Sequence, residues 1–311
     1  MIITVTLNPA LDKTVTIAGF KLDAVNRVSH ARLDAGGKGV NVSKALQAWG
    51  RESTAMGFAG GSGGETLLCE LEAQGIPCSF VRVNGETRTN LKVFDPASHT
   101  YTDINEPGPV VPPGAAEDLF GRLAACIKPN DTVLFAGSSP QGIADDLPAL
   151  WAQALSPKGA RIVADLDGPR LKAMVESKPY LIKPNASELA ELCGLADMRM
   201  ESLAKAARNL VQKGVGRVAV SMGPKGALFV DKAGVLLATG PRVDAVSTVG
   251  AGDTLLAGLL LGMENGAPKE QAARFAVAAA TAKVTCPGSS PPSYAEVFSY
   301  VERIGITVLK G

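Results

Sequence analysis

The 311-residue sequence has only two histidines, His30 and His99, so it has little material for a Ser-His-Asp triad or a histidine-rich zinc site. Its five cysteines are scattered and odd in number, which indicates reduced thiols and no disulfide framework. The net charge is +1, so the chain has no strong field for nucleic acid or anionic membranes. No apolar run is long enough to span a bilayer, and the N-terminus lacks a secretory signal pattern. We therefore expect a cytoplasmic protein.

Apolar strand-like runs alternate with helix-length segments along most of the chain. This rhythm predicts a single α/β domain over residues 1–311, with a doubly wound, mostly parallel sheet and helices on both faces. Ligands bind at the carboxyl ends of the strands in such sheets. The predicted strands are Ile2–Leu7, Thr54–Phe58, Thr132–Ala136, Arg161–Asp165, Tyr180–Ile182 and Arg217–Ser221, and the predicted helices are Val40–Trp49, Glu65–Gln74 and Leu203–Lys213.

Two stretches, at about 14–34 and 89–105, break this rhythm with polar/apolar alternation and no helix between. The alternation, which includes a run at 27–33, predicts short antiparallel strands with one solvated face. Because they are inserted between α/β units, they are expected to form a small sheet that stands over the main one as a lid. Such a sheet would cover a cleft or pair with a second copy of the chain; the alternative is an ordinary edge hairpin.

The stretch Ser247–Thr254 places Gly250, Ala251 and Gly252 directly before Asp253, at the start of a long apolar helix. Glycine lacks the Cβ that would keep a ligand from the amides, and the first helical turn carries unpaired N–H groups and the positive dipole end. The stretch is therefore suited to bind an anion such as a phosphoryl group in transfer, with Asp253 placed to take a proton from a neighbouring hydroxyl. The alternative is that Asp253 only caps the helix.

Two further glycine-rich stretches open predicted helices. In Gly36–Val42, three glycines surround Lys38, which would present amides and an ammonium group to an anionic substrate; the alternative is a flexible turn. The spacing is not that of a Walker phosphate loop. In Phe58–Glu65 the glycines do not have the spacing of a dinucleotide fingerprint, which argues against a nicotinamide-dependent oxidoreductase.

Three more segments have both a structural and a functional interpretation. Asn185 and Glu188 form a capping box by their spacing, but they also suit nucleotide phosphates and a hydrated Mg²⁺. The segment 221–227 is a turn between two strands, or a loop that lies along a nucleotide. Arg88 is either a solvated surface residue or a clamp for a phosphate group.

Five motifs, in their family order, carry a resemblance over essentially the whole chain. The sequence resembles the PfkB group of ribokinase-like carbohydrate kinases. The resemblance implies ATP-dependent, Mg²⁺-assisted transfer of the γ-phosphoryl group to a sugar hydroxyl. The motifs are Asn8–Asp12, Gly36–Val42, Thr87–Asn90, Lys183–Glu188 and Ser247–Thr254.

The resemblance also implies a role for each site residue. Asp253 is the base, and the amides of Gly250, Ala251 and Gly252 hold the charge that develops in transfer. Glu188 would hold the magnesium ion through water. The residues that would bind the nucleotide are Asn185, Glu188, Ser221, Gly223, Lys225 and Gly226. Asp12, Gly37 and Asn41 would bind the sugar hydroxyls. The phosphate that the sugar already carries would be bound by Arg27, Lys38 and Arg88.

Within the family, the segments Lys21–Arg27, Gly36–Gly39 and Asp103–Pro109 are most similar to 1-phosphofructokinases. Tagatose-6-phosphate kinases and 6-phosphofructokinases of the family are the alternatives. A non-catalytic relative that senses sugar phosphates is an alternative of another class; it would have lost Asp253 or the glycine turn.

The resemblance further implies a homodimer through the small sheet. It also implies a monovalent cation such as K⁺, held by backbone carbonyls near Thr285–Pro292, where the prolines of this sequence depart from the family pattern.

Overall fold

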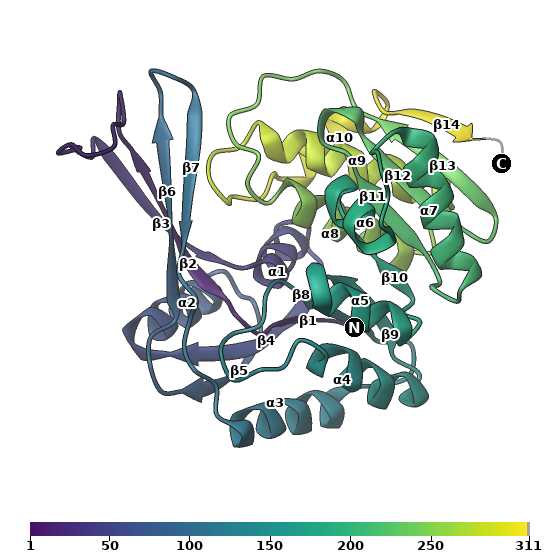
Figure 1. Cartoon of the computed structure of the whole chain (residues 1–311), viewed down its shortest axis with the longest axis horizontal. Helices are drawn as coiled ribbons and strands as arrows, with labels where there is room; N and C mark the ends of the chain where they lie inside the picture. Colours follow the sequence, from purple (N-terminus) through teal and green to yellow (C-terminus); the bar gives the residue numbers. More distant parts are fainter. Residues whose placement is uncertain (310–311) are drawn as a thin grey trace.

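The computed structural model describes residues 1–309, and its centre is a ten-stranded sheet in the order β14-β13-β12-β11-β10-β9-β8-β1-β4-β5 (Figure 1). The strands from β5 to β11 in this order run parallel to one another. From β11 onward, each strand pairs antiparallel with the next: β11 with β12, β12 with β13, and β13 with β14. The strands are β1 (Ile2–Thr6), β4 (Ser53–Gly60), β5 (Cys78–Val83), β8 (Thr132–Ala136), β9 (Arg161–Asp165), β10 (Leu181–Ile182), β11 (Val218–Ser221), β12 (Ala227–Asp231), β13 (Gly234–Thr239) and β14 (Gly305–Leu309).

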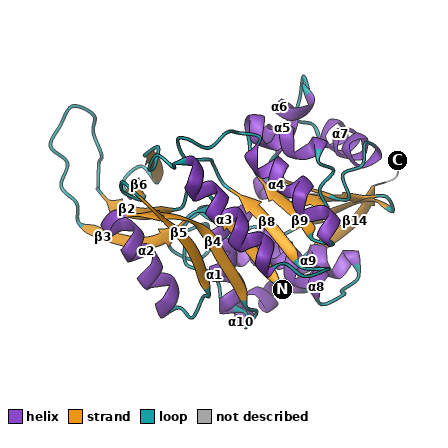
Figure 2. Cartoon of the chain, turned by 90° about the horizontal axis from the view of Figure 1, so that it is seen from below, coloured by secondary structure: helices purple, strands orange, loops and turns teal. Residues whose placement is uncertain are grey.

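Helices cover both faces of this sheet, as the alternating pattern predicted (Figure 2). Ile3 and Val5 of β1 pack in the core beneath α3–α7, whereas Ile2 packs in the core beneath α1 and α8–α10, because successive strand residues point to opposite faces. Within residues 1–309, no helix is long and apolar enough to cross a membrane. The helices are α1 (Lys38–Ala48), α2 (Gly61–Ala73), α3 (Pro113–Cys126), α4 (Leu147–Leu155), α5 (Gly168–Glu176), α6 (Ala186–Cys193), α7 (Met200–Gln212), α8 (Ala251–Glu264), α9 (Lys269–Val284) and α10 (Tyr294–Val301).

A second sheet, in the order β3-β2-β6-β7, stands beside the main body (Figure 1, left). β2 pairs antiparallel with β3, β6 pairs antiparallel with β7, and β2 and β6 run parallel. This is the predicted small sheet, and its strands are β2 (Ala10–Thr16), β3 (His30–Gly36), β6 (Arg88–Asp95) and β7 (Thr100–Asn105).

The boundaries of the second sheet differ from the prediction in one respect that concerns the site. The alternation over 27–33 predicted a strand from Arg27, but β3 begins at His30, where pairing with Thr16 starts. Arg27 therefore lies in the exposed loop that joins β2 to β3, at the end of these strands far from Gly36.

The glycine-rich stretch after β4 is helical from Gly61, four residues before the predicted start at Glu65. The cause is a distant carboxylate: Glu86 accepts hydrogen bonds from the backbone N–H groups of Ser62 at 3.2 Å and Gly63 at 3.0 Å. An acidic side chain thus occupies the amides that a dinucleotide phosphate would need. This supports the exclusion of a nicotinamide-dependent oxidoreductase.

Helix α8 is buried from Asp253 to Gly262, and two of its glycines lie against α9. A Cβ added at Gly258 would lie 3.0 Å from the Cα of Ala276, and one at Gly262 would lie 2.9 Å from the Cα and Cβ of Ala272. These separations leave no room for a methyl group, so the two helices are in backbone contact. This packing determines where the first turn of α8 lies.

We predict opposite effects for two helical Gly→Ala substitutions. Gly262→Ala should lower the free energy of unfolding by about 1–3 kcal/mol, because its Cβ has no space against α9. Gly121→Ala, in α3 where a Cβ would meet nothing within 4 Å, should raise it by about 0.5–1 kcal/mol. Urea unfolding of both variants measures this, and a change of the same sign in both would contradict the packing argument.

Candidate active site

The start of α8 is a tight turn that leads into a buried carboxylate. Gly250 precedes the helix with φ 75°, in the left-handed region that favours glycine, and no side chain among the described residues caps this end. Asp253, the third residue of the helix, is only 8% exposed, and its Oδ2 accepts a hydrogen bond from Nδ2 of Asn41 at 2.7 Å. Asp253 is therefore not a simple helix cap; its side chain faces α1 in the interior.

A second carboxylate lies beside this turn. Asp165, the last residue of β9, is buried and bonds the ammonium groups of Lys38 and Lys183, each at 2.9 Å. A Cβ at Gly252 would lie 3.4 Å from Nζ of Lys183, so this ammonium group lies against the first turn of α8. Burial alone would raise the pKa of Asp165, but the two lysines outweigh it and hold that pKa below its usual value.

The environment of Asp253 has the opposite effect. Burial first, and then the negative charge of Asp165, raise the pKa of Asp253 to about 6, against the opposing effects of Asn41 and the two lysines. Burial would also lower the pKa of Lys38, but Asp165 and Glu188 raise it well above its ordinary value. The site therefore holds a carboxylate that titrates near neutral pH, next to the ammonium group of Lys38, which stays protonated. That combination suits proton acceptance beside an anionic group.

The residues predicted for the nucleotide lie together next to this cluster. Asn185 and Glu188 form the predicted capping box at the start of α6, with bonds of 2.8 and 2.7 Å. The other carboxylate oxygen of Glu188 is 4.0 Å from Nζ of Lys38. Ser221, at the end of β11, pairs with Asn185 in a parallel bridge and leads directly into the turn 223–226, which contains Gly223, Lys225 and Gly226.

Asp12 lies on the second sheet, where that sheet meets α1. Its carboxylate accepts a hydrogen bond from Asn90 at 3.1 Å and pairs with Lys92 at 3.5 Å. A Cβ at Gly36 would lie 2.6 Å from this carboxylate, so a larger residue there would displace it from Asn90 and Lys92. The next residue, Gly37, precedes α1 with φ 110°. Asp12 is thus adjacent to the helix that carries Lys38.

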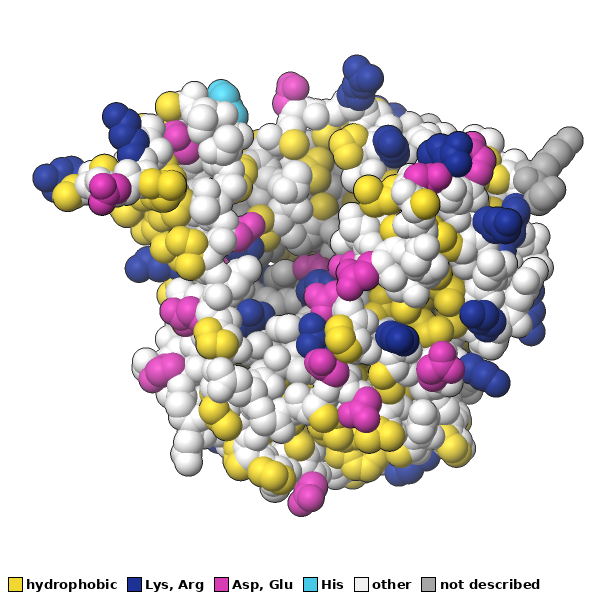
Figure 3. All heavy atoms as spheres, viewed as in Figure 1, with side chains coloured by type: hydrophobic (Ala, Val, Ile, Leu, Met, Phe, Trp, Pro, Cys, Tyr) yellow, Lys and Arg dark blue, Asp and Glu magenta, His cyan; other side chains and the backbone are white. Residues whose placement is uncertain are grey.

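Arg88 and Arg27 lie in different places. Arg88, at the start of β6, donates to the backbone carbonyls of Asn8 at 3.0 Å and Glu106 at 3.3 Å, beside Asp12. Arg27 is in the exposed loop between β2 and β3 and is not brought to this cluster. The space-filling view shows a hollow between the second sheet and the main body, with acidic and basic side chains at its floor (Figure 3).

Sequence reasoning missed two of the residues that organise the site, Asp165 and Lys183. Both had a signal: each stands at or directly after the carboxyl end of a predicted buried strand, the edge where ligands bind in parallel sheets. The interaction between them joins β9 to the segment after β10, and no motif spacing encodes it.

Comparison with known proteins identifies the family. Residues 5–295 match the pfkB family of carbohydrate kinases. The 1-phosphofructokinase of Rhodobacter capsulatus is 40% identical over 278 residues, which cover 89% of this chain and 88% of that protein. The phosphofructokinase-2 of Escherichia coli, solved in complex with substrates and products, is 30% identical with a TM-score of 0.93 and coverage of 97% and 98%. The same enzyme in complex with potassium gives a TM-score of 0.92 at the same identity and coverage.

The chain therefore belongs to the pfkB family of carbohydrate kinases, as the five motifs predicted. It is a kinase of sugar phosphates, and its similarity to a 1-phosphofructokinase extends over most of both chains.

The raised pKa of Asp253 predicts a pH-dependent stability effect. The folded pKa of about 6 lies above the value of about 3.9 expected in the unfolded chain, so the bound proton stabilises the fold below pH 4 and this contribution is lost as the pH rises through 6. Above pH 6 the ionised, buried carboxylate lowers the free energy of unfolding by up to about 3 kcal/mol. Asp253→Asn should therefore raise the melting temperature at pH 8 by a few degrees.

The same substitution should raise the melting temperature only about half as much at pH 5, where the carboxyl group is mostly protonated in the folded protein but already mostly ionised in the unfolded chain. Thermal melting of both proteins at the two pH values makes the comparison. An equal effect at both pH values, or destabilisation at pH 8, would show that burial does not raise this pKa.

Proposed function

We propose that the chain catalyses ATP-dependent phosphorylation of fructose 1-phosphate to fructose 1,6-bisphosphate. The observation that carries the proposal is the buried Asp253 carboxylate at the uncapped start of α8, fixed by Asn41 from the helix that also carries Lys38. The match to the Rhodobacter capsulatus 1-phosphofructokinase supports this substrate.

In the proposed reaction the sugar hydroxyl attacks the γ-phosphorus of ATP in line with the leaving oxygen. The new oxygen–phosphorus bond forms as the bond to the β-phosphate oxygen breaks, and ADP leaves with that electron pair. Asp253 accepts the hydroxyl proton, and the amides of Gly250, Ala251 and Gly252 hold the charge on the transferring group. The N–H of Ala251 also bonds Thr248 at 3.3 Å, which keeps the turn closed.

ATP is assigned to the edge formed by Asn185, Glu188 and the segment 221–226, which contains Ser221, Gly223, Lys225 and Gly226. No group of three or more His, Cys, Asp or Glu side chains within residues 1–309 is arranged to hold a metal ion. One oxygen of Glu188 stays outside the capping box, which suits Mg²⁺ because this ion keeps several waters and takes few protein carboxylates. Bound magnesium would neutralise charge on the phosphates.

The sugar phosphate is assigned to the opposite side of the cleft. Asp12, Gly37 and Asn41 would hold its hydroxyls, and Lys38 and Arg88 its phosphate. Lys38 reaches Asp165 with a side chain that is still 32% exposed, which leaves part of it facing the cleft. Arg27 remains a prediction, because its loop lies at the outer end of the second sheet.

We also propose that two copies associate through the second sheet. This sheet and its loop expose apolar side chains that a partner would cover: Leu22, Val25, Leu33, Tyr101 and Ile104. A cytoplasmic location is part of the same proposal.

Tagatose-6-phosphate kinase or 6-phosphofructokinase activity is the alternative within the family, and the similarity to Escherichia coli phosphofructokinase-2, which has been solved in complex with fructose-6-phosphate, favours the second of these. A non-catalytic sensing protein is disfavoured because Asp253 and its glycine turn are present and assembled.

The experiment that tests the proposal is ADP release from Mg-ATP with fructose 1-phosphate, fructose 6-phosphate, tagatose 6-phosphate and free fructose. We expect a clear preference for fructose 1-phosphate. Preference for one of the 6-phosphates would overturn the substrate and leave the kinase site in place. No release with any of them would favour the sensing protein.

Arg88→Ala should raise the KM for the sugar phosphate by about tenfold or more, because a phosphate clamp is worth at least about 1.4 kcal/mol, with little change in the KM for ATP. Arg122→Ala is the matched control. Arg122 lies on α3, away from the candidate site, and like Arg88 it donates to a backbone carbonyl, that of Phe80, at 3.3 Å. Steady-state kinetics measure both, and an unchanged sugar-phosphate KM would exclude Arg88 as the clamp.

A further inference from the structure

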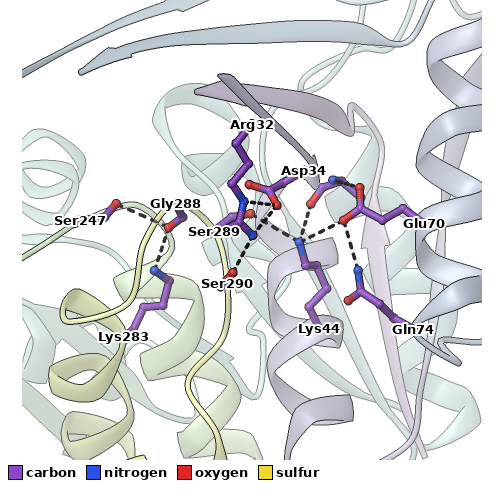
Figure 4. A network of polar contacts seen from close by, with 11 residues as sticks. Arg32, Asp34, Lys44, Glu70, Gln74, Ser247, Lys283, Gly288, Ser289 and Ser290 are labelled. Carbon is purple, nitrogen blue, oxygen red and sulfur yellow. Dashed lines mark hydrogen bonds and ion pairs between the residues drawn. The ribbon is translucent and has the colours of Figure 1, made fainter. Parts of the chain in front are cut away.

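The loop 285–290, which follows α9, lies between the start of α8 and the second sheet (Figure 4). This is the stretch where the family resemblance implies a monovalent cation, and the Escherichia coli phosphofructokinase-2 has been solved in complex with potassium. In the present chain three basic side chains reach the loop. Nζ of Lys283 donates to the carbonyl of Gly288 at 2.8 Å, Lys44 to the hydroxyl of Ser289 at 3.4 Å, and Arg32 to the hydroxyl of Ser290 at 2.6 Å.

Lys283 is the one of these three that lies next to the candidate active site. Its side chain is only 1% exposed, and its Cε would lie 3.5 Å from a Cβ added at Gly250. Lysine is rarely buried to this extent, and the other buried residues of α9 are small: alanines, one valine and one threonine. The ammonium group therefore reaches, from inside the protein, the turn that precedes Asp253.

Backbone carbonyls of Val284 and Gly288 hold the loop before α8 to the segment that follows Lys283. Val246 and Ser247 donate their backbone N–H groups to the carbonyl of Val284 at 2.7 and 3.1 Å, and the hydroxyl of Ser247 lies 3.5 Å from the carbonyl of Gly288. The loop before α8 is thus bonded to the residue after Lys283 and to the carbonyl that Lys283 binds. The positive charge of Lys283 thus binds a carbonyl oxygen of the loop 285–290 to which the loop before α8 is also held.

The other two cations are paired with acids, whereas within residues 1–309 the hydrogen-bond partner of Lys283 is the carbonyl of Gly288, and Asp253 is the nearby acid. Arg32 bonds Asp34 at 2.7 Å, and Lys44 lies 3.7 Å from Glu70. Burial lowers the pKa of Lys283 to about 8, so its amine is mostly protonated at pH 7. A potassium ion next to this ammonium group would be repelled by a charge of the same sign, in a buried place where water screens little. The residues present therefore do not fit an additional monovalent cation.

We propose that Lys283 is a tethered cation that takes the place of a monovalent metal ion in this chain. Its ammonium group carries the same single charge as potassium, and like that ion it binds carbonyl oxygens. It stabilises the turn at Gly250 and so positions the amides and carboxylate of the site. Lys283 is a positioning residue, and the site needs no potassium.

The first test is the salt dependence of the unmodified protein, with potassium chloride compared with tetramethylammonium chloride at equal ionic strength. The melting temperature should agree within about 1 °C, and turnover of the preferred sugar phosphate within about twofold. Only the turnover measurement rests on the proposed function. If no sugar phosphate is turned over in any salt, the proposed function fails, while the melting temperatures still test the role of Lys283.

The second test compares two substitutions that differ in the space they leave. Lys283→Ala removes the charge and opens room for an ion, so turnover should fall by about tenfold or more in tetramethylammonium chloride. Potassium or ammonium chloride should restore most of the turnover and raise the melting temperature. Lys283→Met removes the charge but fills the space, so neither salt should restore the turnover.

Lys44→Met is the matched control, since it removes a buried ammonium group at the other side of the same loop and should create no potassium dependence.

Two results would overturn the proposal. Activation of the unmodified protein by potassium of more than about fivefold, with a rise in melting temperature, would show that an ion binds despite Lys283. A folded Lys283→Ala protein that regains neither turnover nor melting temperature in potassium or ammonium would show that the amine acts in another way, such as direct contact with a phosphate.

Discussion

The arrangement of the site depends on the compensation of buried charge around Asp165. This carboxylate, at the end of β9, binds the ammonium groups of Lys38 and Lys183, and Asp253 adds a second negative charge beside them. Two acids and two bases, supplied by β9, α1, α8 and the segment after β10, thus form a nearly neutral buried group. Removal of Asp165 would leave the buried Lys183 without its carboxylate partner and Lys38 with the more distant Glu188, which is costly in a protein interior.

This group supports the proposed place of the chemistry at the start of α8. The close packing of Gly258 and Gly262 on α9 determines the position of the helix, and Asn41 orients the carboxylate of Asp253 from α1. The positive end of the helix dipole and the lysines attract an anion, whereas burial keeps Asp253 basic enough to accept a proton near neutral pH. Lys283 adds a fixed charge behind the turn, so that the positions of the amides and the carboxylate depend on the same few contacts.

Much of the fold was predictable because its signals are local. The alternation of apolar runs predicted the parallel sheet, and the glycines before Asp253 predicted the tight turn at the start of α8. What could not be predicted comes from tertiary contacts: the early start of α2 at Gly61 depends on Glu86, and the partners of Asp165 come from distant segments. Lys283 gave one signal, a lysine among alanines in a buried helix, but only the structure shows the carbonyl that it binds.

The most direct test of the account is the rate of phosphoryl transfer by Asp253→Asn, together with its affinity for ATP measured by calorimetry. The account predicts a loss of turnover of about 10³-fold or more with ATP affinity nearly unchanged, because the substitution removes the proton acceptor and leaves the nucleotide edge intact. Turnover within about tenfold of the unmodified protein would contradict it and would show that another group accepts the proton.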